Sequence, residues 1–133
     1  MRALKSLLLL VALVAFACGT ASAKSTKSYA GTYGLDSANA TGSLKLTQVK
    51  GAMHQFEIMV YAKDGATCNI DGMIEIEDGL GIFRGTFQKC SLTIHFDKGK
   101  AMVDSGKACD QCGGKATIDG AYVKGKMSKM MKK

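Results

Sequence analysis

The sequence predicts a small all-β domain, and three observations support this prediction. Apolar and polar residues alternate with a period of two over several segments, which is typical of strands with one buried and one exposed face. Glycine-containing turns separate these segments at short intervals. The body of the chain has no long apolar stripe with the 3.6-residue period of an amphipathic helix, and proline and tryptophan are absent from the sequence.

Eight strands are predicted along the chain. In the third, Phe56, Ile58 and Val60 share one face and polar residues occupy much of the other. The same alternation marks the fourth, sixth and last strands, through Cys68, Ile70, Ile74 and Ile76, then Cys90, Leu92, Ile94 and Phe96, then Ala116, Ile118 and Tyr122. The predicted strands span residues 29–35, 42–49, 53–62, 67–77, 81–88, 90–97, 100–105 and 115–124.

Tight hairpins join several of these strands. The turn segments contain residues that tolerate positive φ. They are Lys50-Gly51-Ala52, Asp64-Gly65, Asp78-Gly79 and Lys98-Gly99. Consecutive strands joined by hairpins form an antiparallel meander, and eight of them can close into a barrel without free edges. A two-sheet sandwich is the alternative.

The first and last strands share a short motif. Gly31-Thr32-Tyr33 resembles Gly120-Ala121-Tyr122. A glycine beside a tyrosine lets two backbones approach closely while the ring covers the gap, as the two strands that close a barrel require. A chance resemblance in a glycine-rich β chain is the other interpretation.

The first 23 residues have the three-part plan of a secretory signal peptide. A positive start at Arg2 and Lys5 precedes an apolar run from Leu7 to Ala17 and a small-residue cleavage site at Ala21-Ser22-Ala23. The apolar run is too short for a permanent anchor. We therefore expect a periplasmic or secreted mature chain that begins at Lys24 and has no transmembrane segment.

A lipid anchor is the alternative to cleavage. Cys18 follows Ala15-Phe16-Ala17 and precedes Gly19, which is similar to a bacterial lipoprotein site. That site usually has Leu or Val in place of Ala15 and a small residue in place of Phe16. Since one acyl chain anchors a protein only weakly, cleavage after Ala23 is favoured.

The positive charge of the chain lies in its flanks. Without Arg2 and Lys5 the formal net charge falls from +7 to +5, and between Ser28 and Val123 nine Lys or Arg stand against eleven Asp or Glu. A nucleic-acid-binding face needs basic residues clustered on a folded surface, so nucleic acid is not an expected partner. The predicted units are the signal peptide (1–23), one β-barrel domain (24–123) and a basic tail (124–133).

Four cysteines follow the predicted signal peptide, and an even number in a small exported domain predicts disulfides. We expect a Cys68–Cys90 bond, because a hairpin centred near Gly79 would place these residues opposite each other. Cys109 and Cys112 would then form a small local ring.

The Cys109-Asp110-Gln111-Cys112 segment also suggests other chemistry. A thioredoxin-type pair needs a helix N-terminus at its first cysteine, and this segment lies between two predicted strands. Haem attachment needs histidine where the chain has Gly113, and structural zinc needs a second suitable pair of ligands. Structural disulfides are favoured, and no metal or cofactor is assigned.

Catalytic signatures are absent from the sequence. His54 and His95 are the only imidazoles, and lone histidines beside a turn or on a polar strand face are usually solvated. Glu75 and Glu77 are interpreted as solubilising charge on the outward side of a strand. No nucleophile elbow, phosphate-binding loop or metalloprotease motif occurs. We predict that the protein is not an enzyme.

The tail has an unusual composition, with Met127, Met130 and Met131 at helical spacing. Three interpretations are a disordered solubilising end, a weak contact with an anionic membrane surface or polymer, and a Cu(I) site built from methionine sulfur. Ten residues are too few for a stable isolated helix, which favours the first. The lysines concerned are Lys124, Lys126, Lys129, Lys132 and Lys133.

From Thr67 onward the chain resembles a recurring type of small exported bacterial protein of unassigned function. The shared motifs are Cys68-x-Ile70-x-Gly72, Cys90-x-Leu92-x-Ile94-x-Phe96, Cys109 with Cys112-Gly113, and Asp119-Gly120-x-Tyr122. In fold, such proteins are similar to the small periplasmic barrels that inhibit lysozymes by inserting a loop into the enzyme cleft. The resemblance implies an interaction loop, for which Ser105-Gly106-Lys107 is the candidate.

We therefore expect a non-catalytic binding protein of the bacterial envelope, an inhibitor or protein-interaction module with an unknown protein partner. One alternative is an envelope copper-binding or thiol-redox protein that uses Cys109, Cys112 and the methionine-rich tail. Another is a small-molecule carrier, because lipid- and biotin-binding barrels open with a strand similar to Gly31-Thr32-Tyr33. A barrel of eight strands, however, leaves room for at most one small ligand.

Overall fold

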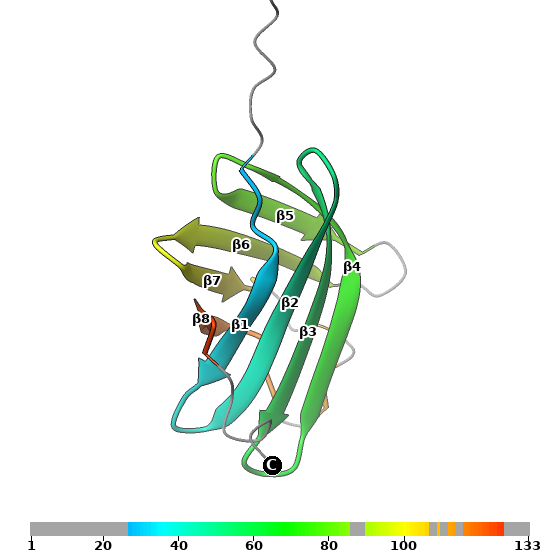
Figure 1. Ribbon diagram of the computed structural model, residues 1–133. Coiled ribbons are helices and arrows are strands. Elements are labelled where there is room, and N and C mark those ends of the chain that lie inside the picture. The colour runs from blue at the N-terminus through cyan, green and yellow to red at the C-terminus, as the bar shows by residue number, and fades with distance from the viewer. Residues whose placement is uncertain (1–26, 86–89, 107–108, 110–111, 114–115, 127–133) are drawn as a thin grey trace, which may run out of the picture.

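Eight antiparallel strands form a single meander that closes into a barrel (Figure 1). The computed structural model describes residues 27–85, 90–106, 109, 112–113 and 116–126. The strands are β1 (Gly31–Asp36), β2 (Ala40–Lys50), β3 (Met53–Ala62), β4 (Thr67–Glu77), β5 (Leu80–Arg84), β6 (Ser91–Asp97), β7 (Lys100–Asp104) and β8 (Gly120–Lys124). The predicted barrel is confirmed, and the two-sheet sandwich is wrong.

The predicted strand limits hold best in the first half of the chain. β3 and β4 begin and end at the predicted residues, whereas β5 ends at Arg84 and β8 begins only at Gly120. The predicted signal peptide and the three methionines of the tail lie outside the described residues. No helix among the described residues is long and apolar enough to cross a membrane.

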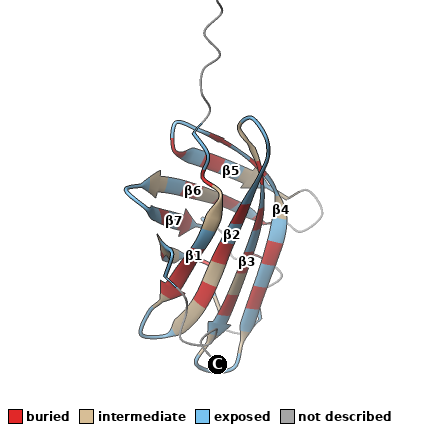
Figure 2. Cartoon of the chain, viewed as in Figure 1, coloured by how far each residue is buried: buried red, intermediate tan, exposed pale blue. Residues whose placement is uncertain are grey.

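The barrel interior is filled with apolar side chains. Along each long strand, buried and exposed residues alternate, so that one face of the sheet forms the core (Figure 2). The largest fully buried side chains include Tyr122, Phe56, Leu44, Ile58, Ile70, Ile74, Leu92, Ile94 and Ile118. These residues come from five strands and the segment before β8, so they join all sides of the barrel into one core.

The pairing of β1 with β8 closes the barrel through a short seam, in which Tyr33 faces Lys124 and Gly34 faces Val123. The Tyr33 hydroxyl donates a hydrogen bond to the carbonyl oxygen of Tyr29, four residues earlier, at 2.9 Å. The Tyr122 hydroxyl donates in the same way to the carbonyl oxygen of Ile118, also four residues earlier, at 2.8 Å.

The shared Gly-x-Tyr motif therefore has a structural basis. The glycine that precedes each tyrosine by two residues has an unusual positive φ, 143° at Gly31 and 151° at Gly120. A Cβ atom on Gly34 would collide with the carbonyl oxygen of Lys126, so the seam also needs glycine there. The two motifs lie in the two strands that meet, as the sequence suggested.

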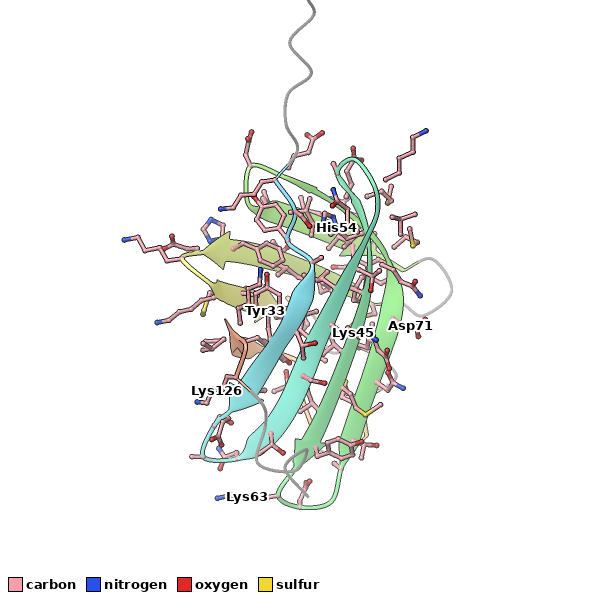
Figure 3. All side chains as sticks on the ribbon, viewed as in Figure 1. Tyr33, Lys45, His54, Lys63, Asp71 and Lys126 are labelled. Atoms are coloured by element: carbon pink, nitrogen blue, oxygen red, sulfur yellow. A yellow bond between two sulfur atoms is a disulfide. The ribbon has the colours of Figure 1, made fainter. Side chains whose placement is uncertain are left out.

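An aromatic cluster closes one end of the barrel, which we call the hairpin end because it carries the turns at 51–52, 78–79 and 98–99. The Tyr29 ring packs against Phe96, with 4.6 Å between ring centroids, and lies edge-on to His54 at 6.1 Å. Figure 3 shows His54 near this end, among the side chains above Tyr33. The segment before β1 thus covers the barrel opening.

The prediction that His54 is solvated is wrong. Its side chain is fully buried, because the period of β3 turns it inward with Phe56. His54 Nδ1 lies 2.9 Å from the carbonyl oxygen of Ala52, so this nitrogen donates, and Nε2 accepts the backbone N–H of Tyr29 at 3.3 Å. The hydrogen bond from the Tyr29 N–H to the imidazole therefore holds the Tyr29 segment over the core.

Two disulfides cross-link the opposite end, but not in the predicted pairing. Cys68 bonds to Cys112, and Cys90 bonds to Cys109. In the β4–β5 hairpin Glu77 faces Leu80, and β5 ends long before it could bring Cys90 beside Cys68. Instead, the connection between β7 and β8 returns to the edge of β4, where Cys112 forms a β-bridge with Cys68.

The corrected pairing closes longer loops than the predicted one. The bonded cysteines are separated by 44 and 19 residues. In the chain-entropy model, loops of these lengths stabilise the fold by about 4 and about 3 kcal/mol. Two disulfides in a domain of this size are consistent with an oxidising compartment outside the cytoplasm.

Peptide mapping without reductant tests the pairing. Trypsin should release one assembly of three peptides, residues 64–84, 90–98 and 108–115, because Cys109 and Cys112 share a peptide and bond to different partners. After further cleavage before aspartate residues, the peptide that contains Cys68 should be disulfide-bonded to residues 110–115. The peptide that contains Cys90 should be disulfide-bonded to residues 108–109. A two-peptide link between Cys68 and Cys90 would contradict the structure.

Alkaline titration tests the seam. Burial, and secondarily the negative charge of Asp119, raises the pKa of Tyr122 above its ordinary value of 10. The folded state holds this proton more tightly than the unfolded chain, so the stabilisation is complete below about pH 10 and is lost as the pH rises toward the folded pKa.

We expect Tyr122→Phe to lower the free energy of unfolding by about 1 kcal/mol at pH 7, because the Ile118 carbonyl loses its donor. Above about pH 10 the gap to the wild type should shrink by up to about 1.4 kcal/mol per pH unit. Urea unfolding of both proteins between pH 7 and 11 measures this difference in the free energy of unfolding. If the free energies of unfolding of the two proteins changed with pH in parallel, burial of a neutral Tyr122 hydroxyl would be contradicted.

Candidate functional site

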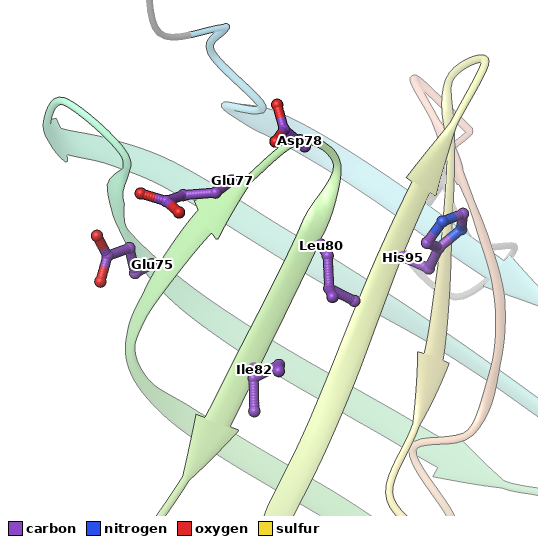
Figure 4. A pocket seen from close by; sticks show the side chains of 6 residues that line it. All are labelled: Glu75, Glu77, Asp78, Leu80, Ile82 and His95. Atoms are coloured by element: carbon purple, nitrogen blue, oxygen red, sulfur yellow. The ribbon is translucent and has the colours of Figure 1, made fainter.

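The outer wall of the barrel carries a candidate site on β4, β5, β6 and β7. A hollow of about 640 Å³ is lined there by Glu75, Glu77, Asp78, Leu80, Ile82 and His95 (Figure 4). Met102 lies directly beside His95 in the strand register. We call these seven residues the acidic–apolar face.

Strand register explains why these side chains lie together. Leu80 pairs with Glu77 on one side and with His95 on the other, so one row of outward residues crosses three strands. Ile82 pairs with Glu75 and extends the same surface by one position along β5. Residues two apart on a strand project from the same face. The face is therefore contiguous.

Packing inside the barrel forces the apolar residues of β5 outward. The inward positions opposite β5 are filled by Ile74 and Ile76, and a Cβ atom on Gly81 would lie only 2.7 Å from Ile74 Cδ1. Gly81 consequently faces inward and the large neighbours face solvent. Leu80, Ile82 and Met102 are 41, 52 and 48% exposed.

Carboxylates border this apolar surface on one side. Figure 4 shows Glu75, Glu77 and Asp78 along β4 and the following turn, and His95 on the far side of Leu80. Three neighbouring negative charges produce a local potential that attracts cationic groups. Among the described residues, no group of three His, Cys, Asp or Glu side chains could hold a metal ion. The arrangement suits contact with a surface that is both basic and apolar.

The predicted interaction loop is only partly within the described residues. Ser105 is buried, and its backbone N–H donates to Asp119 Oδ1 at 2.6 Å. Gly106 is exposed, its N–H donates to Asp104 Oδ1 at 2.9 Å, and Lys107 lies outside the described residues. Little of Ser105 is therefore accessible at the surface.

Cys109 and Cys112 do not form a local redox centre with each other. Cys109 and Cys112 bond to different partners, so the two sulfurs of the motif are not oxidised against each other. Cys68, Cys90 and Cys109 are also buried. Metal binding by a thiolate of Cys109 or Cys112 would first require reduction of the disulfide that holds it.

Of the five tail lysines, two are described. Lys124 and Lys126 are exposed, and the Lys124 ammonium lies 5.9 Å from the centroid of the Tyr33 ring. Lys129, Lys132 and Lys133 lie outside the described residues.

The sequence contains a signal for the acidic–apolar face in β5. Leu80 and Ile82 alternate with Gly81 and Phe83, so the strand has no polar face at all. A short strand with large apolar residues at its outward positions indicates a contact surface. The acidic residues of β4 border this surface.

No protein-family model matches the chain, and no curated protein or solved structure is significantly similar to it. The resemblance to lysozyme-inhibiting barrels therefore stays a prediction.

Two isoleucine variants test whether the face is dispensable for folding. Ile82→Ala should change the free energy of unfolding by less than about 1 kcal/mol, since the side chain is half exposed. The matched variant Ile94→Ala, at a fully buried position of the neighbouring strand, should cost about 2–5 kcal/mol. Urea unfolding measures both. An equal loss in the two variants would show that Ile82 serves the core.

Proposed function

We propose that this protein is a non-catalytic binding module of the bacterial envelope, which holds a protein partner through its acidic–apolar face. The observation that carries the proposal is the half-exposed state of Leu80, Ile82 and Met102 beside three carboxylates. Soluble proteins rarely expose contiguous apolar side chains without a binding role.

The chemistry of the face indicates the kind of partner. Apolar side chains that become buried supply the free energy of association, and charges at the rim steer the encounter and select the partner. Because the rim residues Glu75, Glu77 and Asp78 are acidic, the partner should present Lys or Arg beside apolar residues. Inhibition of a basic enzyme is one form that such binding takes.

A carrier function has less support. The core side chains from all sides of the barrel meet in its interior, and Tyr29 lies across the hairpin end. Filled interiors of small barrels leave little room for a ligand. The hollow at the acidic–apolar face is instead on the outer wall.

The envelope location rests on two observations. Four cysteines in two disulfides are stable in an oxidising compartment, and the first 23 residues have the plan of an export signal. The barrel would meet its partner after export.

Site-specific photo-crosslinking tests the proposal. A benzoylphenylalanine residue at Ile82 should form an adduct with one basic envelope protein, identified by mass spectrometry. The same residue at Val49, an exposed apolar position on β2, is the matched control and should not form it. The adduct should weaken at high salt, because the charged rim contributes to association.

Charge reversal separates the face from general electrostatics. Glu75→Lys with Glu77→Lys should abolish the adduct, whereas Glu57→Lys with Asp71→Lys, an exposed cross-strand pair elsewhere, should preserve it. No adduct at Ile82, equal loss in both double variants, or an adduct with a second copy of this chain would each overturn the proposal.

A further inference from the structure

A second hollow lies at the hairpin end and has the opposite charge. Its described lining includes four lysines, Lys27, Lys98, Lys100 and Lys124, and a single carboxylate, Asp97. These lysines come from the segment before β1, the β6–β7 hairpin and the end of β8. Residues from both flanks of the sequence thus meet at one place on the folded surface.

Aromatic rings form the floor of this hollow. Tyr29, Tyr33 and Phe96 pack against one another there. The Lys27 ammonium lies 5.6 Å from the centroid of the Tyr29 ring, and the Lys124 ammonium 5.9 Å from that of Tyr33. Cation–π attraction at these distances holds both ammonium groups near the rim.

The backbone leaves room for the lysines. A Cβ atom on Gly31 would lie 3.0 Å from Lys124 Cε, so glycine lets the lysine stem cross β1. Gly99, between Lys98 and Lys100, has a φ of 78°. A Cβ atom placed on Gly99 would have no neighbouring atom within 4 Å. The turn therefore presents its two lysines next to open space.

We propose that this hollow binds a phosphate group. Its volume is about 80 Å³, far below the several hundred Å³ of pockets for larger organic ligands. It therefore suits a small, compact anion. Lysine ammonium groups bind phosphate as point charges, and four of them against one carboxylate favour a ligand with more than one negative charge.

The neighbouring turn limits where the anion sits. The Phe96 N–H donates to the Gly79 carbonyl oxygen at 2.7 Å, which places the acidic turn with Asp78 beside the β6–β7 hairpin. Repulsion from that side keeps the phosphate over the lysines. This site is separate from the acidic–apolar face and does not depend on the proposed protein partner.

Amide NMR of the full, oxidised chain tests the site. Sodium phosphate, compared with sodium chloride at equal ionic strength, should cause saturable shifts of the Lys98, Gly99 and Lys124 amides. Lys98→Ser with Lys100→Ser should weaken binding about tenfold or more, since charge-assisted contacts are lost. The matched variant Lys45→Ser with Lys63→Ser, on the β2 wall and at the far turn in Figure 3, should bind as the wild type does.

A vesicle arm distinguishes a free phosphate group from a lipid headgroup. Sedimentation with phosphatidylglycerol vesicles but not with phosphatidylcholine vesicles, lost in the Lys98/Lys100 variant, assigns the site to an anionic headgroup. Phosphate binding without vesicle binding assigns it to a soluble phosphorylated ligand. Identical shifts in phosphate and chloride without such vesicle binding, or equal loss of binding in both double variants, overturn the proposal.

Discussion

The β1–β8 seam is the constraint on which the rest of the structure depends. Only two residue pairs join these strands, yet they convert an open sheet into a barrel without free edges. Tyr33 and Tyr122 support the seam from within, each through a hydroxyl bonded to a carbonyl four residues earlier. Because the hydroxyls are satisfied, large rings can be buried without the cost of unpaired polar groups. Closure then lets side chains from all strands fill one interior.

A filled barrel moves function to its surface. Tyr29 covers the hairpin end, and the disulfides tie the β7–β8 connection across the other. The remaining features that need an explanation are outside: apolar residues of β5 and β7 bordered by acids, and lysines gathered over aromatic rings. They differ in charge and have no residue in common. One barrel thereby presents two chemically distinct surfaces around a filled core.

Local patterns predicted most of the fold and little of the site. Alternation with period two located β3 and β4, because most inward residues there are buried and most outward residues are exposed. The predicted disulfide pairing is wrong because the connection between β7 and β8 brings Cys112 to Cys68. The register of a single hairpin does not reveal this contact. The prediction for His54 is wrong because the in–out alternation along a strand, and not nearness to a turn, decides whether a residue is buried. The lysine-lined hollow requires knowing that β1 and β8 become neighbours, which depends on closure. The acidic–apolar face requires the register of β4, β5 and β6.

Cross-strand NOE contacts at the seam test the central claim most directly. A closed and filled barrel predicts NOEs between Gly34 and Val123, together with slow hydrogen exchange of the Gly125 amide, which donates to the Thr32 carbonyl oxygen at 2.9 Å. Absence of these NOEs with rapid exchange at Gly125 would indicate an open sheet. The interior would then be accessible, and the assignment of function to the outer surface would be contradicted.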